Sequence, residues 1–136
     1  MPRTIIQTVT FKNTSPEILY GIYMDSKKHS DATGGEAKIT SKEGASYSAW
    51  DGYITGKNFQ LMKNKIIVQS WRSGDFKTTD LDSTLILQFY KKGKDAILLM
   101  VHANVPAQAY PGIKKGWDDF YWKPWKIYLS KNKITT

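Results

Sequence analysis

Residues 116–129, GWDDFYWKPWKIYL, decide the fold that this sequence can adopt. At about 100° per residue, residues 113–129 gather large apolar groups into one arc, as an amphipathic helix requires. That arc consists of Ile113, Trp117, Phe120, Tyr121, Pro124 and Tyr128. Polar residues fill another arc, where Asp119 stands at the i,i+4 spacing of helical ion pairs from both Lys115 and Lys123. We therefore expect a long C-terminal helix that buries its aromatic arc against a sheet.

Three more large apolar residues, Trp122, Trp125 and Leu129, project from the flank of that arc. Either flanking loops cover them, or they form an exposed aromatic patch of the kind on which protein interfaces concentrate their binding energy. Pro124 has no backbone N–H, and its ring clashes with the preceding helical turn. We expect a kink there, or a fresh helical start with Pro124 in its first position. A kink would let the helix wrap a curved sheet or hold open a cavity beneath it.

The residues before this helix alternate in polarity, as antiparallel strands do. A strand is expected over residues 4–12, then a helix that Ser15 or Thr14 caps and Pro16 opens, then a short helix or turn over residues 25–35. Further strands are expected over residues 37–41, 45–50, 52–61, 65–71, 84–90 and 95–104. In the last of these, Ile97, Leu99, Val101 and Ala103 share one face. Meandering strands before a closing helix indicate an α+β fold with a sheet of about six or seven strands.

The composition argues for a polar surface and against several classes of protein. The length of 136 residues predicts one domain over residues 1–136, and the formal net charge is +8. Arg3 and Arg72 are the only arginines, and lysines supply the other positive charges in ones and twos. Such a field favours an acidic partner, whereas nucleic-acid binding normally needs clustered charge and more arginine. Cysteine is absent, which excludes disulfides and thiolate chemistry.

The N-terminal sequence MPRTIIQTVTFK lacks the apolar segment of a signal peptide. The longest apolar run, residues 96–101, suits a buried strand and is far shorter than the roughly 18 residues that a membrane span needs. We therefore expect an unexported cytoplasmic protein that has no membrane segment.

Both ends of the chain resemble the activator of Hsp90 ATPase homologue 1-like family. The segments QTVTF (7–11), SPEILY (15–20) and MDSKKHS (24–30) open like a domain of that family, and residues 116–129, which follow Val105-Pro106, are similar to its closing helix. The resemblance covers nearly the whole chain, although the middle strands match in order and spacing more than in residues.

This resemblance implies a helix-grip fold of the START and Bet v 1-like (SRPBCC) superfamily. In that fold a strongly curved antiparallel sheet grips a long C-terminal helix, and two short helices follow the first strand. In eukaryotic co-chaperones of the family such a domain forms the C-terminal half and helps to stimulate the chaperone's ATPase. The N-terminal half, which carries much of the chaperone contact, has no counterpart in this sequence. The wider superfamily often binds apolar ligands between helix and sheet.

The sequence holds no constellation that is typical of catalysis or metal binding. His29 lies in a polar turn and is expected to be exposed, whereas His102 is expected to form local hydrogen bonds. Neither has a partner at the spacing of a zinc site, and no phosphate loop or nucleophile elbow occurs. An enzyme would need His102, Tyr121 or Asp51 to converge in a cavity, and nothing in the sequence indicates that they do. We predict a protein that is not an enzyme and has no catalytic residues, metal or cofactor.

Two binding functions remain. The first is a co-chaperone-like or stress-response interaction module that uses Trp122, Trp125 and Leu129 to bind an Hsp90-type chaperone or another acidic protein. The second is a carrier or sensor of a small hydrophobic ligand, held in a cavity between the C-terminal helix and the sheet. The expected lining of that cavity is Trp50, Phe59, Trp71, Leu87, Phe89, Leu99, Trp117, Phe120 and Tyr121. Alternatively, these residues pack on one another and leave no void.

Overall fold

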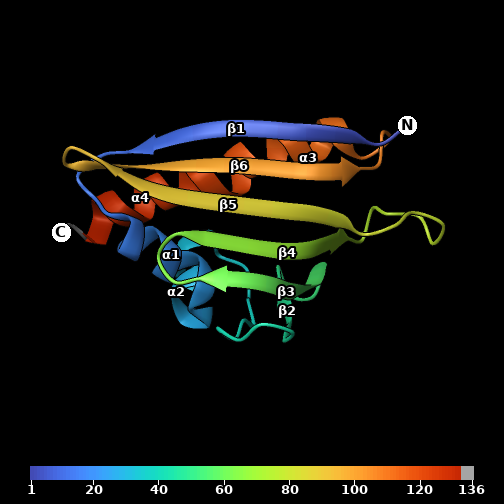
Figure 1. The fold of residues 1–136 in the computed structure, drawn as a ribbon, viewed down its shortest axis with the longest axis horizontal. Coiled ribbons are helices and arrows are strands. Elements are labelled where there is room, and N and C mark those ends of the chain that lie inside the picture. The colour runs from blue at the N-terminus through green and yellow to red at the C-terminus, as the bar shows by residue number, and fades with distance from the viewer. Residues whose placement is uncertain (133–136) are drawn as a thin grey trace.

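A computed structural model describes residues 1–132 and shows the α+β architecture expected from the sequence, a curved antiparallel sheet with the C-terminal helix behind it (Figure 1). The sheet has six strands in the order β1-β6-β5-β4-β3-β2. The strands are β1 (Arg3–Phe11), β2 (Ser46–Ala49), β3 (Ile54–Met62), β4 (Ile66–Ser73), β5 (Ser83–Lys92) and β6 (Asp95–Val105). The helical elements are α1 (Pro16–Met24), α2 (Ser26–Thr33), α3 (Tyr110–Trp117), the π-helical turn η1 (Asp118–Trp122) and α4 (Lys123–Asn132).

The two short helices after β1 begin and end where the sequence signals predict. The Ser15 hydroxyl accepts a hydrogen bond from the backbone N–H of Ile18, and Pro16 occupies the first turn of α1. Asp25 ends α1 and at once caps α2 through its carboxylate, so no loop separates the helices. Gly34, at a φ of 91°, closes α2 in the left-handed conformation that glycine adopts without strain.

One predicted strand is absent, and one strand residue lies on the opposite face from the one expected. Residues 37–41 form no strand and make only an isolated bridge between Lys38 and Ser48. In β6 the face toward the core carries Ala96, Leu98, Met100 and His102, all fully buried. Ile97, Leu99, Val101 and Ala103 share one face as predicted, but it is the outer, half-buried face, so Leu99 does not point toward the cavity. Both faces of this strand are apolar, so alternation alone could not distinguish them.

The C-terminal helix, made of α3, η1 and α4, is continuous but widens before Pro124. The backbone N–H of Lys123 donates to the carbonyl of Asp118, five residues back, where an α-helix would use four. The wider turn occurs where Pro124 can offer no hydrogen bond to Phe120 and where its ring would crowd that carbonyl. The expected irregularity at Pro124 therefore takes the form of a π-helical turn, with Pro124 as the second residue of α4.

The wider turn changes which side chains of the C-terminal helix face the sheet. Trp122, Trp125 and Leu129 are 1%, 0% and 8% exposed, whereas Phe120 is 56% exposed. Trp117 and Tyr121 of the predicted arc are buried as expected, but Phe120 is not, because constant 100° steps do not hold through a π-helical turn. The three residues expected to form an exposed partner surface belong instead to the core, where the ring of Phe11 on β1 packs against both tryptophans.

Among the described residues, no helix is both long and apolar enough to cross a membrane. Over residues 1–132, no three histidine, aspartate or glutamate side chains gather in a way that could hold a metal ion.

Candidate functional site

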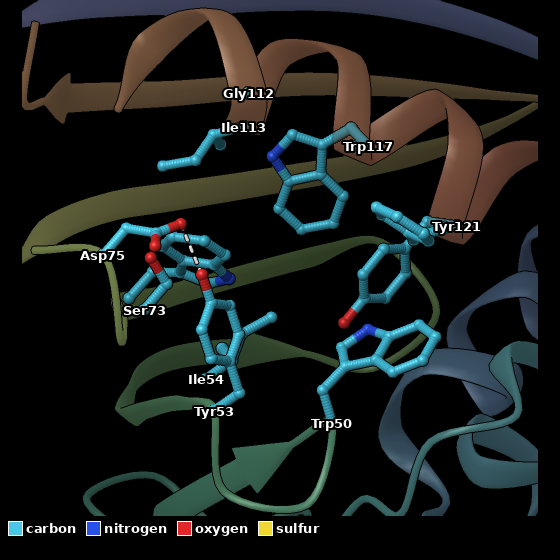
Figure 2. Close-up of a pocket in the computed structure, with 12 residues that line it drawn as sticks. Trp50, Tyr53, Ile54, Ser73, Asp75, Gly112, Ile113, Trp117 and Tyr121 are labelled. Carbon is cyan, nitrogen blue, oxygen red and sulfur yellow. Dashed lines mark hydrogen bonds between the residues drawn. The ribbon is translucent and has the colours of Figure 1, made fainter. Parts of the chain in front are cut away.

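A pocket of about 440 Å³ lies between the C-terminal helix and the edge of the sheet that carries β2 to β4. Figure 2 shows Ile113, Trp117 and Tyr121 entering it from the helix and Trp50, Tyr53 and Ile54 entering it from the opposite side. Its lining is Trp50, Tyr53, Ile54, Trp71, Ser73, Asp75, Gly112, Ile113, Gly116, Trp117, Phe120 and Tyr121. A cavity between helix and sheet therefore exists, as expected, and half of its lining residues are aromatic.

The solvent exposure of the lining side chains distinguishes the floor of the pocket from its mouth. Trp71, Trp117 and Tyr121 are almost fully buried and form the floor. Tyr53 and Phe120 are 47% and 56% exposed and stand at the mouth. A pocket with an apolar floor and few polar groups is the usual form of a small-molecule site.

Trp117 is held to the sheet by a chain of buried hydrogen bonds. Its indole Nε1–H donates to His102 Nδ1 at 3.0 Å, and His102 Nε2 lies 2.8 Å from Ser83 Oγ. The Ser83 hydroxyl donates in turn to the carbonyl of Trp71 at 2.8 Å. Because an indole N–H can only donate, Nδ1 is unprotonated and Nε2 carries the ring proton. Burial lowers the pKa of His102 to about 3, so the ring remains neutral, and its predicted local hydrogen bonding is confirmed.

His29, predicted to be exposed, is fully buried against the same helix. Its Nδ1 lies 2.8 Å from the carbonyl oxygen of Tyr23, and its Nε2 lies 3.4 Å from the Tyr121 hydroxyl. A carbonyl only accepts, so Nδ1 carries the proton and Nε2 is the acceptor. Burial lowers the pKa of His29, and the bond to Tyr23 opposes this in part. The prediction failed because the residues next to His29 in the sequence are polar, and they give no sign that α2 packs on the C-terminal helix.

Trp50 enters the pocket from a turn that tryptophan seldom occupies. Trp50 and Asp51 join β2 to β3 with φ angles of 52° and 58°, a left-handed conformation that normally selects asparagine or glycine. Gly35 makes room for the indole, because a Cβ atom on Gly35 would come within 2.4 Å of Trp50 Cε3. The ring packs edge-on against Phe120, with centroids 5.8 Å apart. The backbone therefore accepts strain where it presents this side chain to the pocket.

Two glycines keep the helix side of the pocket open. Gly112 and Gly116 lie one helical turn apart, and both line the pocket. A Cβ atom on Gly112 would meet nothing within 4 Å, and one on Gly116 would meet only the ring of Phe120, at 3.4 Å. In a helix each glycine costs up to about 1 kcal/mol relative to alanine. Small residues here preserve space that larger ones would fill.

Polar groups of the pocket gather at one end. Trp71 Nε1 and Ser73 Oγ are buried and have no hydrogen-bond partner among the described residues. Nearby, the Tyr53 hydroxyl donates to the Asp75 carboxylate (Figure 2). Partial burial and the Asp75 carboxylate raise the pKa of Tyr53, against the opposing effect of the Ser73 hydroxyl. Asp75 is the only charged side chain of the lining.

The structure brings some of the expected lining residues together and leaves others elsewhere. Trp50, Trp71, Trp117, Phe120 and Tyr121 line the pocket. Phe59 is 55% exposed next to a bulge in β3, Leu87 and Phe89 lie in the core away from the pocket, and Leu99 is on the outer face. Sequence reasoning missed Tyr53, Ile54, Ser73, Asp75, Gly112, Ile113 and Gly116. Gly116, a glycine inside the predicted helix, was the one available signal for part of this set.

The residues considered for catalysis do not converge. His102 does not line the pocket, and both of its ring nitrogens are already hydrogen-bonded. Asp51 is exposed, and its carboxylate accepts a hydrogen bond from the backbone N–H of Glu36. Tyr121 alone reaches the pocket, and burial raises the pKa of its hydroxyl.

Comparison with known proteins agrees with the resemblance seen in the sequence. No protein-family model matches the chain. The activator of 90 kDa heat shock protein ATPase homolog 1 of Homo sapiens, and equally that of Mus musculus, is 26% identical over 110 residues, which cover 81% of this chain and 32% of the relative. The chain thus spans about a third of the length of these curated relatives.

Solved structures share the architecture. An HSP90 activator from Plasmodium falciparum superposes with a TM-score of 0.86 at 24% identity, covering 93% of this chain and 96% of that chain. CalU16 from Micromonospora echinospora superposes with a TM-score of 0.80 at 17% identity, covering 94% and 74%. The helix-grip fold and the activator-like resemblance predicted from the sequence are thereby confirmed.

Acid is expected to weaken this fold through its two buried histidines. The pKa values of His29 and His102 are lowered from 6.5, that of His102 to about 3, so the unfolded chain binds more protons as the pH falls between these values. The free energy of unfolding should then fall by up to about 1.4 kcal/mol per pH unit for each histidine. His102→Gln keeps one acceptor and one donor but does not titrate. Urea unfolding from about pH 6.5 to 4 should show a shallower slope for this variant, and equal slopes would refute the assignment.

Proposed function

We propose that residues 1–136 form one non-enzymatic binding domain whose binding element is the aromatic pocket, and that it takes up a small apolar molecule. The proposal rests on three residues around the pocket that lower the stability of the fold. Left-handed Trp50 costs on the order of 1–3 kcal/mol, and Gly112 and Gly116 cost up to about 1 kcal/mol each. Side chains that merely filled a core would relieve these costs. These destabilising residues are explained if the pocket has to stay open for a bound molecule.

The state of two polar side chains supports binding without catalysis. His102 does not line the pocket, and both of its ring nitrogens are hydrogen-bonded, so it offers no lone pair to a bound molecule. Asp75, the one charged residue of the lining, is paired with the Tyr53 hydroxyl. A cytoplasmic place of action is part of the same proposal.

Filling the pocket from the helix should abolish uptake without unfolding the protein. N-Phenyl-1-naphthylamine, a neutral two-ring fluorophore, is expected to bind wild type at one saturable site. Gly112→Leu and Gly116→Leu place a side chain where space is now open, and each should weaken the apparent affinity at least about tenfold while the helix keeps or gains stability. Fluorescence titration and thermal unfolding measure the two effects.

Gly21→Ala is the control for that experiment. Gly21 lies in α1, away from the pocket, and an added Cβ would approach only Lys28 Nζ, at 3.9 Å. It raises helix propensity as the pocket variants do, but should leave the affinity for the fluorophore unchanged. Absence of saturable uptake by wild type, or undiminished uptake by both leucine variants, would refute the proposed function.

A second candidate is the co-chaperone-like contact with an Hsp90-type chaperone. The sequence match to activators of the 90 kDa heat shock protein ATPase supports it, and so does the net charge of +8, which favours an acidic partner. The buried Trp122, Trp125 and Leu129 are not available for this contact. The outer face of the sheet offers an alternative apolar row, in which Ile6 pairs with Val101 and Val101 with Ile86.

A titration of the ¹⁵N-labelled chain with an Hsp90-type chaperone tests this second candidate. Backbone signals of Ile6, Ile86 and Val101 should shift or broaden, and Ile86→Glu should weaken the interaction at least about tenfold through like-charge repulsion with an acidic surface. The Gly112→Leu variant should bind the chaperone as wild type does. No perturbation along the outer face at saturating chaperone would exclude this contact.

A further inference from the structure

One carboxylate lines a pocket that is otherwise uncharged. Of the 12 residues that line the pocket, Asp75 alone bears a charge, and no lysine, arginine or histidine is among them. The whole chain holds 20 lysines and arginines against 12 acidic residues, so an even spread of charge would more readily place a cation here. A molecule that enters the pocket therefore meets a charge opposite in sign to that of the protein as a whole.

The carboxylate of Asp75 is both accessible and held in position. Asp75 is exposed and lines the pocket, so a bound molecule can reach it. Among residues 1–132, only the Tyr53 hydroxyl engages this carboxylate, at Oδ2, and no ion pair involves it. Gly74 lets the two side chains meet, because a Cβ atom on Gly74 would come within 2.8 Å of Tyr53 Cε1. A carboxylate has about four lone-pair sites, so most of its capacity to accept hydrogen bonds is unused.

The polar end and the aromatic end of the pocket are separate. Figure 2 shows the Asp75 carboxylate and the Tyr53 hydroxyl at one end, Trp50 and Tyr121 at the other, and the Trp117 indole between them. The ring centroids of Trp117 and Tyr121 lie 4.6 Å apart, and those of Trp50 and Tyr121 lie 6.5 Å apart. A molecule that fills the pocket would therefore lay an apolar ring system on the aromatic end and place its polar group at Asp75.

The groups around the mouth favour a positive charge on that polar group. An ammonium group donates hydrogen bonds and carries a positive charge, so it can pair with the carboxylate oxygen of Asp75 that Tyr53 leaves free. Tyr53 and Phe120 expose aromatic rings at the mouth, and ring faces attract cations. An anionic group would be desolvated beside the carboxylate with no cation in the lining to offset the cost.

From these observations we infer that the pocket selects amines, namely small molecules with a flat, apolar ring system and one ammonium group that pairs with Asp75. This inference rests on the proposed uptake of a small apolar molecule and adds the charged group that distinguishes its ligands. Because the ion pair lies at an exposed site, its contribution to affinity is modest. The selectivity comes from the rejection of acids as well as from the attraction of amines.

Three naphthalene derivatives test this preference with one ring system. At neutral pH, 2-naphthylmethylamine is a cation, 2-naphthalenemethanol is neutral and 2-naphthoic acid is an anion. Wild type should bind the amine about three- to tenfold more tightly than the alcohol, the effect of one partly exposed charged hydrogen bond, and the acid most weakly. The net charge of +8 alone would favour the reverse order. Displacement of N-phenyl-1-naphthylamine measures the three affinities.

Two aspartate variants separate the contact at Asp75 from the charge of the whole protein. Asp75→Asn removes the charge but keeps a side-chain oxygen that can accept from Tyr53, so it should bind the amine and the alcohol equally. Asp31→Asn makes the same change of net charge at an exposed residue of α2 that does not line the pocket, and it should keep the wild-type order. Both carboxylates are exposed, and thermal unfolding checks that each variant keeps its fold.

A preference for the amine in wild type and in Asp31→Asn that disappears in Asp75→Asn supports the inference. Three results overturn it while leaving the pocket as a binding site: equal or weaker binding of the amine by wild type, a preference that survives in Asp75→Asn, or a preference that Asp31→Asn loses as well. Asp75 would then serve only to hold Tyr53. If neither these probes nor N-phenyl-1-naphthylamine binds, the proposed function itself fails, and the inference fails with it.

Discussion

The structure depends on one local irregularity, the π-helical turn over Asp118–Trp122. Pro124 cannot complete an α-helical hydrogen bond to Phe120, and the wider turn removes that conflict by pairing Lys123 with Asp118. The extra residue brings side chains from before and after the turn onto one face. Trp117 and Trp122 can then stack, with ring centroids 5.4 Å apart and planes inclined by 14°. In a regular α-helix, with about 100° per residue, Trp122 would stand about 140° around the axis from Trp117 and could not stack on it.

This shared face of the C-terminal helix explains both why the helix is held firmly to the sheet and why a pocket remains beside it. Polar groups of the sheet fix two of its indoles, because His102 accepts from Trp117 and Gln7 accepts from Trp122. A helix held in this way at its buried face does not have to collapse onto β2 and β3. The space left over becomes the pocket, with Trp50 closing the side away from the helix. The pocket and the packed core thus use different surfaces of the same tryptophan-rich helix.

The sequence was informative where a local rule had only one outcome. A cap at Thr14 or Ser15, a first helix opened by Pro16 and the succession of most strands along the chain required no knowledge of the packed core, and all were predictable. It misled where two outcomes were locally equivalent. β6 is apolar on both faces, so Leu99 was placed inward, and a constant helical step placed Phe120 inward and Trp122 outward. Neither error could be corrected without the long-range contacts that choose between faces.

The central claim is that the π-helical turn sets the buried face of the C-terminal helix, and a pair of substitutions tests it directly. Urea unfolding of Trp122→Ala should show a loss of about 3–5 kcal/mol, because a fully buried indole and its hydrogen bond to Gln7 disappear. Phe120→Ala, at a side chain 56% exposed, should cost about 1 kcal/mol or less. The opposite order, with Phe120→Ala the more damaging change, would mean that the helix winds regularly through this segment and that the account is wrong.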